Sequence, residues 1–178
     1  MKNSEAIASA FLNQSVEYLV NHYQLKIENC LSQLSDEQIW WRPNSSSNSI
    51  GNLVLHVCGN ARQWIVAGLG DEPDERVRSS EFEQTEIIAR GKLLDLLKET
   101  LVDVEHVLEN LPSEVLLGTR KIQGKDVGVL EAVFHVTEHF ALHTGQIITL
   151  TKLLTASDLR FYDFEDDVPS QRWNVGQD

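Results

Sequence analysis

The stretch LLDLLKETLVDVEHVLENLP, residues 93–112, decides the fold prediction for this chain. Its apolar side chains recur at alternating intervals of three and four residues, and this series is Leu94, Leu97, Leu101, Val104, Leu108 and Leu111. The spacing puts them on one side of a helix, where they form a seam that packs against other helices in a bundle. Pro112 ends the segment, because proline lacks the amide hydrogen and clashes with the preceding turn.

Three more segments show helical periodicity, and they cover residues 4–34, 50–69 and 129–154. The regions between the four segments are rich in turn-forming, polar or charged residues, which favour loops. We therefore predict an all-α protein with a single four-helix bundle in residues 1–155. The connector TRKIQGKDV, residues 119–127, allows a short extended segment before the last helix.

The ends of the segments carry helix-capping signals. Ser35 precedes a short helical turn through Trp41, and Ser49 precedes the second long helix. A serine in this position accepts a hydrogen bond from a free backbone amide. The C-terminal residues 156–178 are acidic but also carry Phe161, Tyr162, Phe164 and Trp173. We expect this tail to pack on the bundle.

The charge balance limits the classes of partner. The chain of 178 residues has 27 acidic and 15 basic residues, a formal net charge of −12, which repels nucleic acid and anionic lipid. No apolar run approaches the roughly 18 residues of a membrane span, and no signal peptide is recognisable. We therefore expect a cytoplasmic protein that binds neither nucleic acid nor membranes. Cys30 and Cys58 are expected to be reduced and buried.

Three of the six histidines lie in FHVTEHFALHTGQ, residues 134–146, and they are His135, His139 and His143. Histidines four residues apart on a helix can share a metal ion, because their Cβ atoms are about 5–6 Å apart. His135 and His143 are about 12 Å apart along the axis, which is too far. Helix geometry therefore allows His135 with His139, or His139 with His143, and does not choose between these pairs.

A third ligand must come from another helix, and His56 has informative neighbours. The residues on its side of the helix are small or polar, namely Ser49, Asn52, Gly59, Asn60, Gln63 and Ala67. Such a face could line a wet pocket or could simply be exposed to solvent. The sequence favours neither interpretation.

The pentapeptide HVTEH, residues 135–139, matches the H-x-x-E-H signature of inverted zinc peptidases, in which Glu138 would be the general base. Those enzymes need an acidic ligand from a distant downstream helix. Only 39 of the 178 residues follow His139, and the acids among them lie in the tail. A zinc peptidase is therefore a minor alternative.

Four stretches in this order resemble the DinB superfamily, a group of proteins regarded as metalloenzymes: IWWRP (39–43), NSIGNLVLHVCGNARQWI (48–65), DERVRSSEF (74–82) and HVTEHFALHTGQI (135–147). The resemblance implies a four-helix bundle of up-down-down-up topology, often a homodimer. It also implies a metal site made of one histidine from the second helix and an H-x-x-x-H pair before a GQ in the fourth. The ligands here would be His56, His139 and His143, followed by Gly145 and Gln146. By the same resemblance, the earlier His135 would be a neighbour of the site.

The resemblance also implies a type of chemistry. Characterised members of the superfamily include transferases and isomerases that use bacillithiol, mycothiol or related low-molecular-weight thiols. We therefore expect a divalent metal ion, zinc or nickel first, although iron, manganese and copper also accept imidazole ligands. The expected activity is transfer of a small thiol cosubstrate to or from a small-molecule electrophile. The alternatives are a metal-dependent hydrolase on the same histidines and a non-catalytic metal-binding protein of stress response or protein interaction.

Three polar residues are candidates to contact substrate. Arg42 could bind an anionic group, and Asn52 and Asn60 share the helix face of His56, where they could orient solvent or substrate. Arg76, Arg78 and Glu81 lie in the charged region between the second and third long helices. We expect them to form local ion pairs in a solvated loop.

Overall fold

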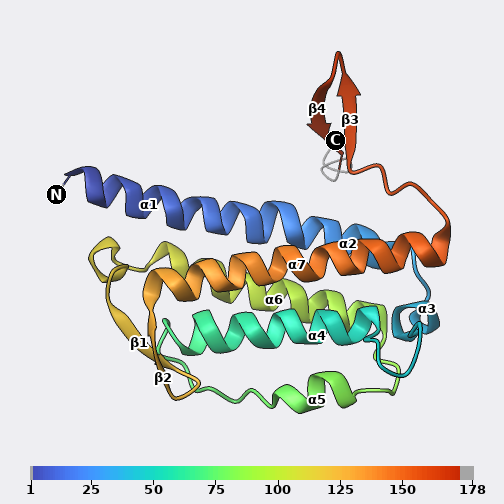
Figure 1. Cartoon of the computed structure of the whole chain (residues 1–178), viewed down its shortest axis with the longest axis horizontal. Coiled ribbons are helices and arrows are strands. Elements are labelled where there is room, and N and C mark those ends of the chain that lie inside the picture. The colour runs from blue at the N-terminus through green and yellow to red at the C-terminus, as the bar shows by residue number, and fades with distance from the viewer. Residues whose placement is uncertain (1, 173–178) are drawn as a thin grey trace.

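The structure is a computed structural model that describes residues 2–172, and it is mostly helical with two small hairpins (Figure 1). The helices are α1 (Lys2–Val16), η1 (Glu17–Gln24), α2 (Leu25–Ser32), α3 (Asp36–Trp40), α4 (Ile50–Ala61), η2 (Arg62–Ala67), α5 (Arg78–Glu83), α6 (Arg90–Glu109), η3 (Ser113–Val115) and α7 (Val129–Thr155). The strands are β1 (Thr119–Ile122), β2 (Lys125–Gly128), β3 (Tyr162–Glu165) and β4 (Val168–Gln171). Four long helical stretches run side by side, as the periodicity predicted.

The apolar seam of α6 lies in the core of the molecule. Its central residues Leu97, Leu101, Val104 and Leu108 are at most 1% exposed, and α6 contacts α1, η1, α2, α4 and η2. Burying one such side chain stabilises the fold by about 1.5–3 kcal/mol relative to leaving it in water. The seam therefore contributes strongly to the core that holds the other helices in place.

Two of the predicted helices contain a wide π-helical turn, which the periodicity did not reveal. The first predicted segment is continuous through α1, η1 and α2, and η1 is π-helical. The second continues from α4 into η2, which is also π-helical. Because a π turn contains more residues than an α turn, each segment rotates its face relative to an uninterrupted α-helix. The apolar side chains of α2, Ile27, Cys30 and Leu31, are nevertheless buried.

Both predicted serine caps are present. The Ser49 hydroxyl accepts a hydrogen bond from the backbone amide of Asn52, and the Asn52 side chain accepts one from the backbone amide of Ser49. Ser35 and Gln38 form the same reciprocal arrangement at the start of α3. These caps satisfy amides that a helix start leaves without partners, and so they confirm where both helices begin.

The extended segment before the last helix is also confirmed. Strands β1 and β2 form an antiparallel hairpin in which Ile122 pairs with Lys125. The two residues between them, Gln123 and Gly124, both have positive φ angles, 52° and 74°. A two-residue turn with two positive φ angles matches the right-handed twist of the strands. The hairpin leads directly into α7 at Val129.

The region between α4 and α6 is more ordered than the sequence indicated. It contains α5, which packs on α4, and in Figure 1 this segment runs along the outer side of α4. Glu81 of α5 is only 7% exposed. The prediction of a solvated loop for Arg76 and Glu81 is therefore wrong, because their charged groups face α4 instead of water.

The residues after α7 begin against the core and continue into an exposed hairpin. Leu159 is buried and Phe161 packs against the core, whereas strands β3 and β4 are exposed along their length. Trp173 lies outside the described residues. The division of the chain at residue 155 stays a prediction. Within residues 2–172, no helix combines the length and apolar character that a membrane span requires, and both cysteines are buried free thiols.

Candidate metal centre

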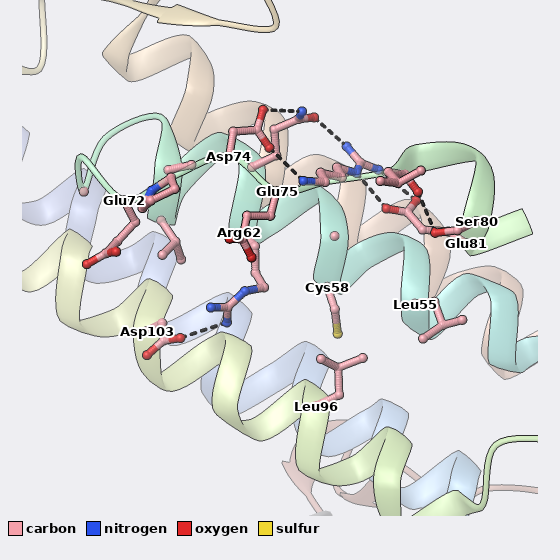
Figure 2. Close-up of a pocket in the computed structure, with 18 of the residues that line it drawn as sticks. Leu55, Cys58, Arg62, Glu72, Asp74, Glu75, Ser80, Glu81, Leu96 and Asp103 are labelled. Atoms are coloured by element: carbon pink, nitrogen blue, oxygen red, sulfur yellow. Dashed lines mark hydrogen bonds and ion pairs between the residues drawn. The ribbon is translucent and has the colours of Figure 1, made fainter.

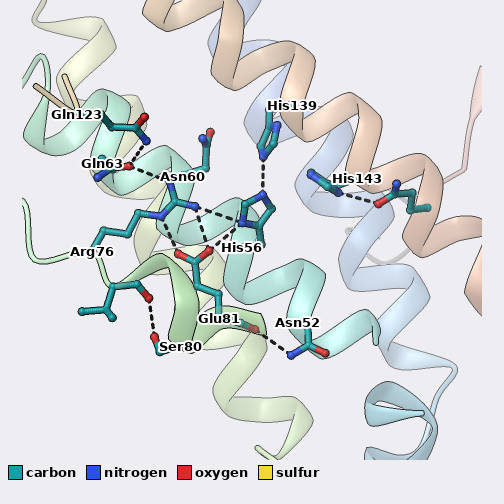
Figure 3. Close-up of polar contacts among 12 residues, drawn as sticks. Asn52, His56, Asn60, Gln63, Arg76, Ser80, Glu81, Gln123, His139 and His143 are labelled. Carbon is teal, nitrogen blue, oxygen red and sulfur yellow. Dashed lines mark hydrogen bonds and ion pairs between the residues drawn. The ribbon is translucent and has the colours of Figure 1, made fainter. Parts of the chain in front are cut away.

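Helices α4 and α7 bring His56, His139 and His143 together (Figure 3). One potential ligand atom from each residue lies within 4.8 Å of the other two. The Nε2 atoms of His56 and His139 are 2.9 Å apart. The ring of His143 is 4.4 Å from that of His139 and 5.0 Å from that of His56, measured between centroids. This is the set of histidines that the family resemblance implied.

The ring of His56 is held by a carboxylate. Its Nδ1 atom lies 2.8 Å from Oε2 of Glu81. An ionised carboxylate only accepts hydrogen bonds, so Nδ1 must carry the proton and donate it. The nearby Nη2 atom of Arg76 lies 3.2 Å from Nδ1 and 3.0 Å from Oε2, and it therefore donates to the carboxylate. In neutral His56, Nε2 then carries the lone pair and accepts a hydrogen bond from His139 Nε2 at 2.9 Å.

His143 is oriented in a similar way by an amide. Its Nδ1 atom lies 2.8 Å from Oε1 of Gln146, one turn further along α7. The amide oxygen can only accept, so Nδ1 donates and neutral His143 keeps its Nε2 lone pair for another partner. Gln146 belongs to the GQ dipeptide after the histidine pair. That glutamine thus has a direct physical role next to the cluster.

The surroundings keep two of the three imidazoles neutral. Burial, together with the neighbouring His143 and His56, lowers the pKa of His139 to about 3. Burial also lowers the pKa of His143, although the hydrogen bond with Gln146 opposes this shift. Metal ions bind the neutral form of imidazole, so no proton has to leave either ring at neutral pH.

Glu81 and Arg76 form a buried ion pair behind His56. Arg76 Nε donates to Glu81 Oε1 at 2.7 Å, and the two side chains are 5% and 9% exposed. Burial alone would raise the pKa of the Glu81 carboxyl. The hydrogen bonds from His56 and Arg76 and the charge of Arg76 outweigh burial and hold the pKa below its usual range. Glu81 is therefore an anion at neutral pH.

His135 lies outside the cluster. Its Nε2 atom is 3.2 Å from the amide nitrogen of Asn60, and its ring is 4.1 Å from that of Trp64. The single group of potential metal ligands found among residues 2–172 does not include His135. Of the two pairs that helix geometry allowed, the later one, His139 with His143, lies beside His56 in the structure. The structure gives no support to a peptidase site at residues 135–139, where Glu138 is exposed.

The face of α4 around His56 lines a buried region and is not exposed to solvent. Asn52, His56 and Asn60 are all at most 5% exposed. Glu81 and Gln84 contact Asn52 and His56, and His135 of α7 contacts Asn60. The side chain of Asn52 donates to the backbone carbonyls of Glu81 and Gln84. Of the two interpretations of this helix face, the pocket is the one that the structure supports.

Arg42 contacts the same covering segment. Its guanidinium donates to Asn52 Oδ1 at 2.8 Å and to the carbonyls of Phe82 and Gln84 at 3.0 and 3.1 Å. These contacts fasten the end of α5 to α4. Substrate binding stays a prediction for Arg42, Asn52 and Asn60.

The donor set fits a divalent metal ion. Zinc binds imidazole nitrogen at about 2.0–2.1 Å, which puts two tetrahedral ligands about 3.4 Å apart. The His56 and His139 nitrogens are slightly closer than this, and the whole cluster is within 4.8 Å. Carboxylate and amide groups that orient metal-binding histidines through the second ring nitrogen are typical of metal sites. Both kinds of support are present here.

Two cavities reach residues that contact the cluster. One of about 870 Å³ is enclosed by α4, α6 and residues 72–84, and Arg76 and Glu81 form part of its wall (Figure 2). The other, of about 520 Å³, lies between residues 43–48 and α7 and is lined by Leu53, Leu142 and Gln146. None of the three histidines lines either cavity. The larger one reaches Glu81, the partner of His56, and the smaller one reaches Gln146, the partner of His143.

Sequence reasoning missed Glu81 and Arg76 as parts of the site. One signal was present: the DERVRSSEF stretch belongs to the family resemblance and carries five charged residues before a phenylalanine that packs on His56. Charge runs are usually solvated, so the local pattern argued for the wrong environment.

Comparison with known proteins places this arrangement among related folds. Residues 6–164 match the family described as "Protein of unknown function (DUF1572)". The fold is similar to that of a DinB-like protein from Bacillus subtilis, with 20% identity and a TM-score of 0.62 over 82% of this chain and 94% of the other. It is also similar to a conserved protein from Enterococcus faecalis, with 16% identity and a TM-score of 0.62 over 85% and 97%.

A DinB-like protein from Bacillus cereus shows 17% identity and a TM-score of 0.60 over 80% of this chain and 90% of the other. No curated protein matches the chain. Identities this low show a common fold and nothing about activity. The fold is therefore DinB-like.

Proposed function

Because this chain belongs to the DUF1572 family and has a DinB-like fold, we propose that it is a metal-dependent enzyme. The metal would be a divalent ion held by His56, His139 and His143. The observation that carries the proposal is the three-histidine cluster, in which the second ring nitrogens of His56 and His143 are already bonded to Glu81 and Gln146. Zinc or nickel is the expected ion.

Three imidazoles leave at least one coordination position for another ligand, as in catalytic metal sites. When bound there, the ion would lower the pKa of a coordinated water or thiol and so supply a nucleophile at neutral pH. The protein's own part is to hold the rings. The hydrogen bonds to Glu81 and Gln146 hold the proton of each partner histidine on Nδ1. Burial keeps His139 and His143 in the neutral form.

The proposed substrate is a small molecule. The cavity of about 520 Å³ beside Gln146 is within the size range of small-molecule sites, about 300–1,000 Å³. Its wall combines the apolar Leu53 and Leu142 with the polar Gln146, Ser46 and Asn48. We favour transfer of a low-molecular-weight thiol to or from an electrophile that carries an apolar part, in agreement with the resemblance described above.

The same resemblance supports two further proposals about the whole molecule. The long helices would form a four-helix bundle of up-down-down-up topology in residues 1–155, and two chains would associate as a homodimer. The cytoplasmic location expected from the sequence stays a prediction. Exposed apolar residues on α7, such as Phe134 at 59% exposure, are consistent with association of two chains.

Metal content tests the site itself. We expect about one ion per chain in the purified protein after incubation with zinc or nickel, and a large loss in His56→Ala, His139→Ala and His143→Ala. His135→Ala is the matched control, because it removes a histidine from the same helix but outside the cluster. If His135→Ala lost the metal while His143→Ala kept it, the assignment of ligands would be wrong.

Turnover assays test the activity. The metal-loaded protein is incubated with several small thiols and electrophiles, and with ester and amide substrates without thiol. Thiol-dependent turnover that disappears in His143→Ala supports the transferase. Turnover that needs no thiol would instead identify a hydrolase. If neither occurs in protein that binds metal, a non-catalytic metal-binding role replaces the enzyme proposal.

A further inference from the structure

We infer that Glu81 is a positioning residue of the metal centre, which fixes the ring of His56 so that Nε2 faces the ion. Arg76 and the contacts of residues 81–84 with α4 hold Glu81 in that place. This inference rests on the proposed metal site and assigns a role to a segment that supplies none of the three metal ligands.

The contact with Glu81 fixes the tautomer of His56. A neutral imidazole can carry its proton on either nitrogen, and only the form with the proton on Nδ1 offers Nε2 as a ligand. The contact of 2.8 Å between Nδ1 and Glu81 Oε2 selects this form. The Nε2 atom then lies on the side of His139, at 2.9 Å from its Nε2. Glu81 therefore determines which nitrogen of His56 is available.

The Glu81 carboxylate has little freedom to move or rotate. Arg76 donates to both of its oxygens, at 2.7 Å from Nε and 3.0 Å from Nη2, and Arg76 is itself held by Gln63 Oε1 at 2.9 Å. Two parallel bonds between a guanidinium and a carboxylate restrict both position and rotation. A Cβ atom at Gly59 would collide with Glu81 Oε1, so the carboxylate packs directly on the backbone of α4.

The backbone of residues 81–84 is also held in place by hydrogen bonds. Asn52 donates to the carbonyl of Glu81 at 2.9 Å. Arg42 donates to the carbonyls of Phe82 and Gln84. The Phe82 ring lies 4.7 Å from that of His56, so two consecutive residues of α5 contact the same imidazole. These bonds make the position of the carboxylate a property of the fold.

A purely structural ion pair would not need this arrangement. Burying a glutamate and an arginine costs desolvation energy that their mutual attraction often only offsets. Here one carboxylate oxygen is directed at the histidine that would bind the ion, and both side chains are at least nine-tenths buried. Residues that orient metal ligands in this way typically contribute about 10- to 100-fold to metal affinity.

The test compares Glu81→Gln with Glu83→Gln, two substitutions that remove one negative charge from the same helix. Glu83 is exposed and serves as the control. In Glu81→Gln, the amide can still accept from His56, but its NH₂ group then faces the guanidinium of Arg76. We expect zinc affinity, measured by competition with a chromophoric chelator, to fall about 10- to 100-fold in Glu81→Gln and to stay within about twofold in Glu83→Gln.

A second measurement reports on the ring itself and needs no variant of Glu81. In metal-free wild-type protein at pH 7.5, the imidazole ¹⁵N chemical shifts of His56 are expected to show a protonated Nδ1 and an unprotonated Nε2. The His56 signals are identified by their absence in His56→Ala.

The outcomes distinguish failure of the proposed metal site from failure of the proposed role of Glu81. If wild-type protein binds no zinc, the proposed metal site is wrong and the role of Glu81 in it falls as well. If wild type binds zinc but Glu81→Gln binds it equally well, only the role of Glu81 is overturned. A His56 ring with its proton on Nε2 would also overturn that role. If Glu81→Gln does not fold, as judged by circular dichroism, Arg76→Lys replaces it, because lysine cannot form two parallel bonds to the carboxylate and should weaken zinc binding.

Discussion

Acid should destabilise the metal-free protein through His139 in particular. The folded pKa of His139 is about 3, whereas an unfolded histidine titrates near about 6.5. Between these values the unfolded chain binds a proton that the folded protein does not bind. Stability from this residue is therefore fully present above about pH 6.5 and decreases as the pH falls toward about 3.

The size of the effect follows from linkage. Lowering the pH from about 7 to about 4.5 would cost about 2.5 kcal/mol for the full shift. Because His139 is only about half buried, solvent screens part of this, and we expect about 1–2.5 kcal/mol. With about 2.1 cal/mol/K of unfolding entropy per residue, a chain of 178 residues would lose about 3–7 °C in Tm.

The assay is urea denaturation of metal-free protein at both pH values, with His139→Gln as the comparison. Wild type should lose more stability than the variant, by the amount calculated above. Removal of His139 also relieves the electrostatic repulsion that its neighbours experience when they are protonated. The variant therefore loses less stability in acid, and the difference between wild type and variant can only increase. An equal or larger loss in His139→Gln would refute the argument that burial of this imidazole opposes its protonation.

Three further predictions concern the core and the site. Gly59→Ala should weaken zinc binding in a titration and destabilise the protein by about 1–3 kcal/mol, because the added methyl group displaces a buried carboxylate; unchanged affinity would argue against close packing there. Leu101→Ala should lower the free energy of unfolding by about 2–5 kcal/mol, while Val102→Ala, at an exposed position, should change it by less than about 0.5 kcal/mol. If both variants lost the same stability in urea titrations, the predicted orientation of α6 toward the core would be wrong. Burial raises the pKa values of Cys30 and Cys58 to about 11 and about 12, so neither thiol should react with a disulfide reagent at pH 8 until the protein unfolds; rapid reaction in native protein would show that the thiols are accessible.

The long helices could be predicted from sequence because their signals are local. The stripe of α6, the serine caps of α3 and α4, and the turn at Gln123 and Gly124 each depend on a few neighbouring residues. The π-helical turns in η1 and η2 were not predicted. They depend on how each helix packs against the others, and a plot of hydrophobic period does not contain that information.

The candidate site was only partly accessible for the same reason. Spacing on one helix allowed two histidine pairs, and the choice depends on where α4 meets α7, since His56 reaches His139 and not His135. Helix geometry alone could not show which turn of α7 faces His56, whereas the family resemblance implied it. Glu81 escaped detection because it lies 25 residues from its partner His56, in a segment whose charges resemble those of an exposed loop.

The packing of residues 71–84 on α4 has a thermodynamic consequence for the proposed metal centre. The segment contributes Glu81 to His56 but none of the three ligands, so its docking and ion binding form two coupled equilibria. Coupling of this kind is reciprocal: whatever favours docking raises the affinity for the ion, and the ion in turn stabilises the docked segment. Occupants of the adjacent cavity of about 870 Å³, which Arg76 and Glu81 line, would therefore act on the histidines through this segment without touching them.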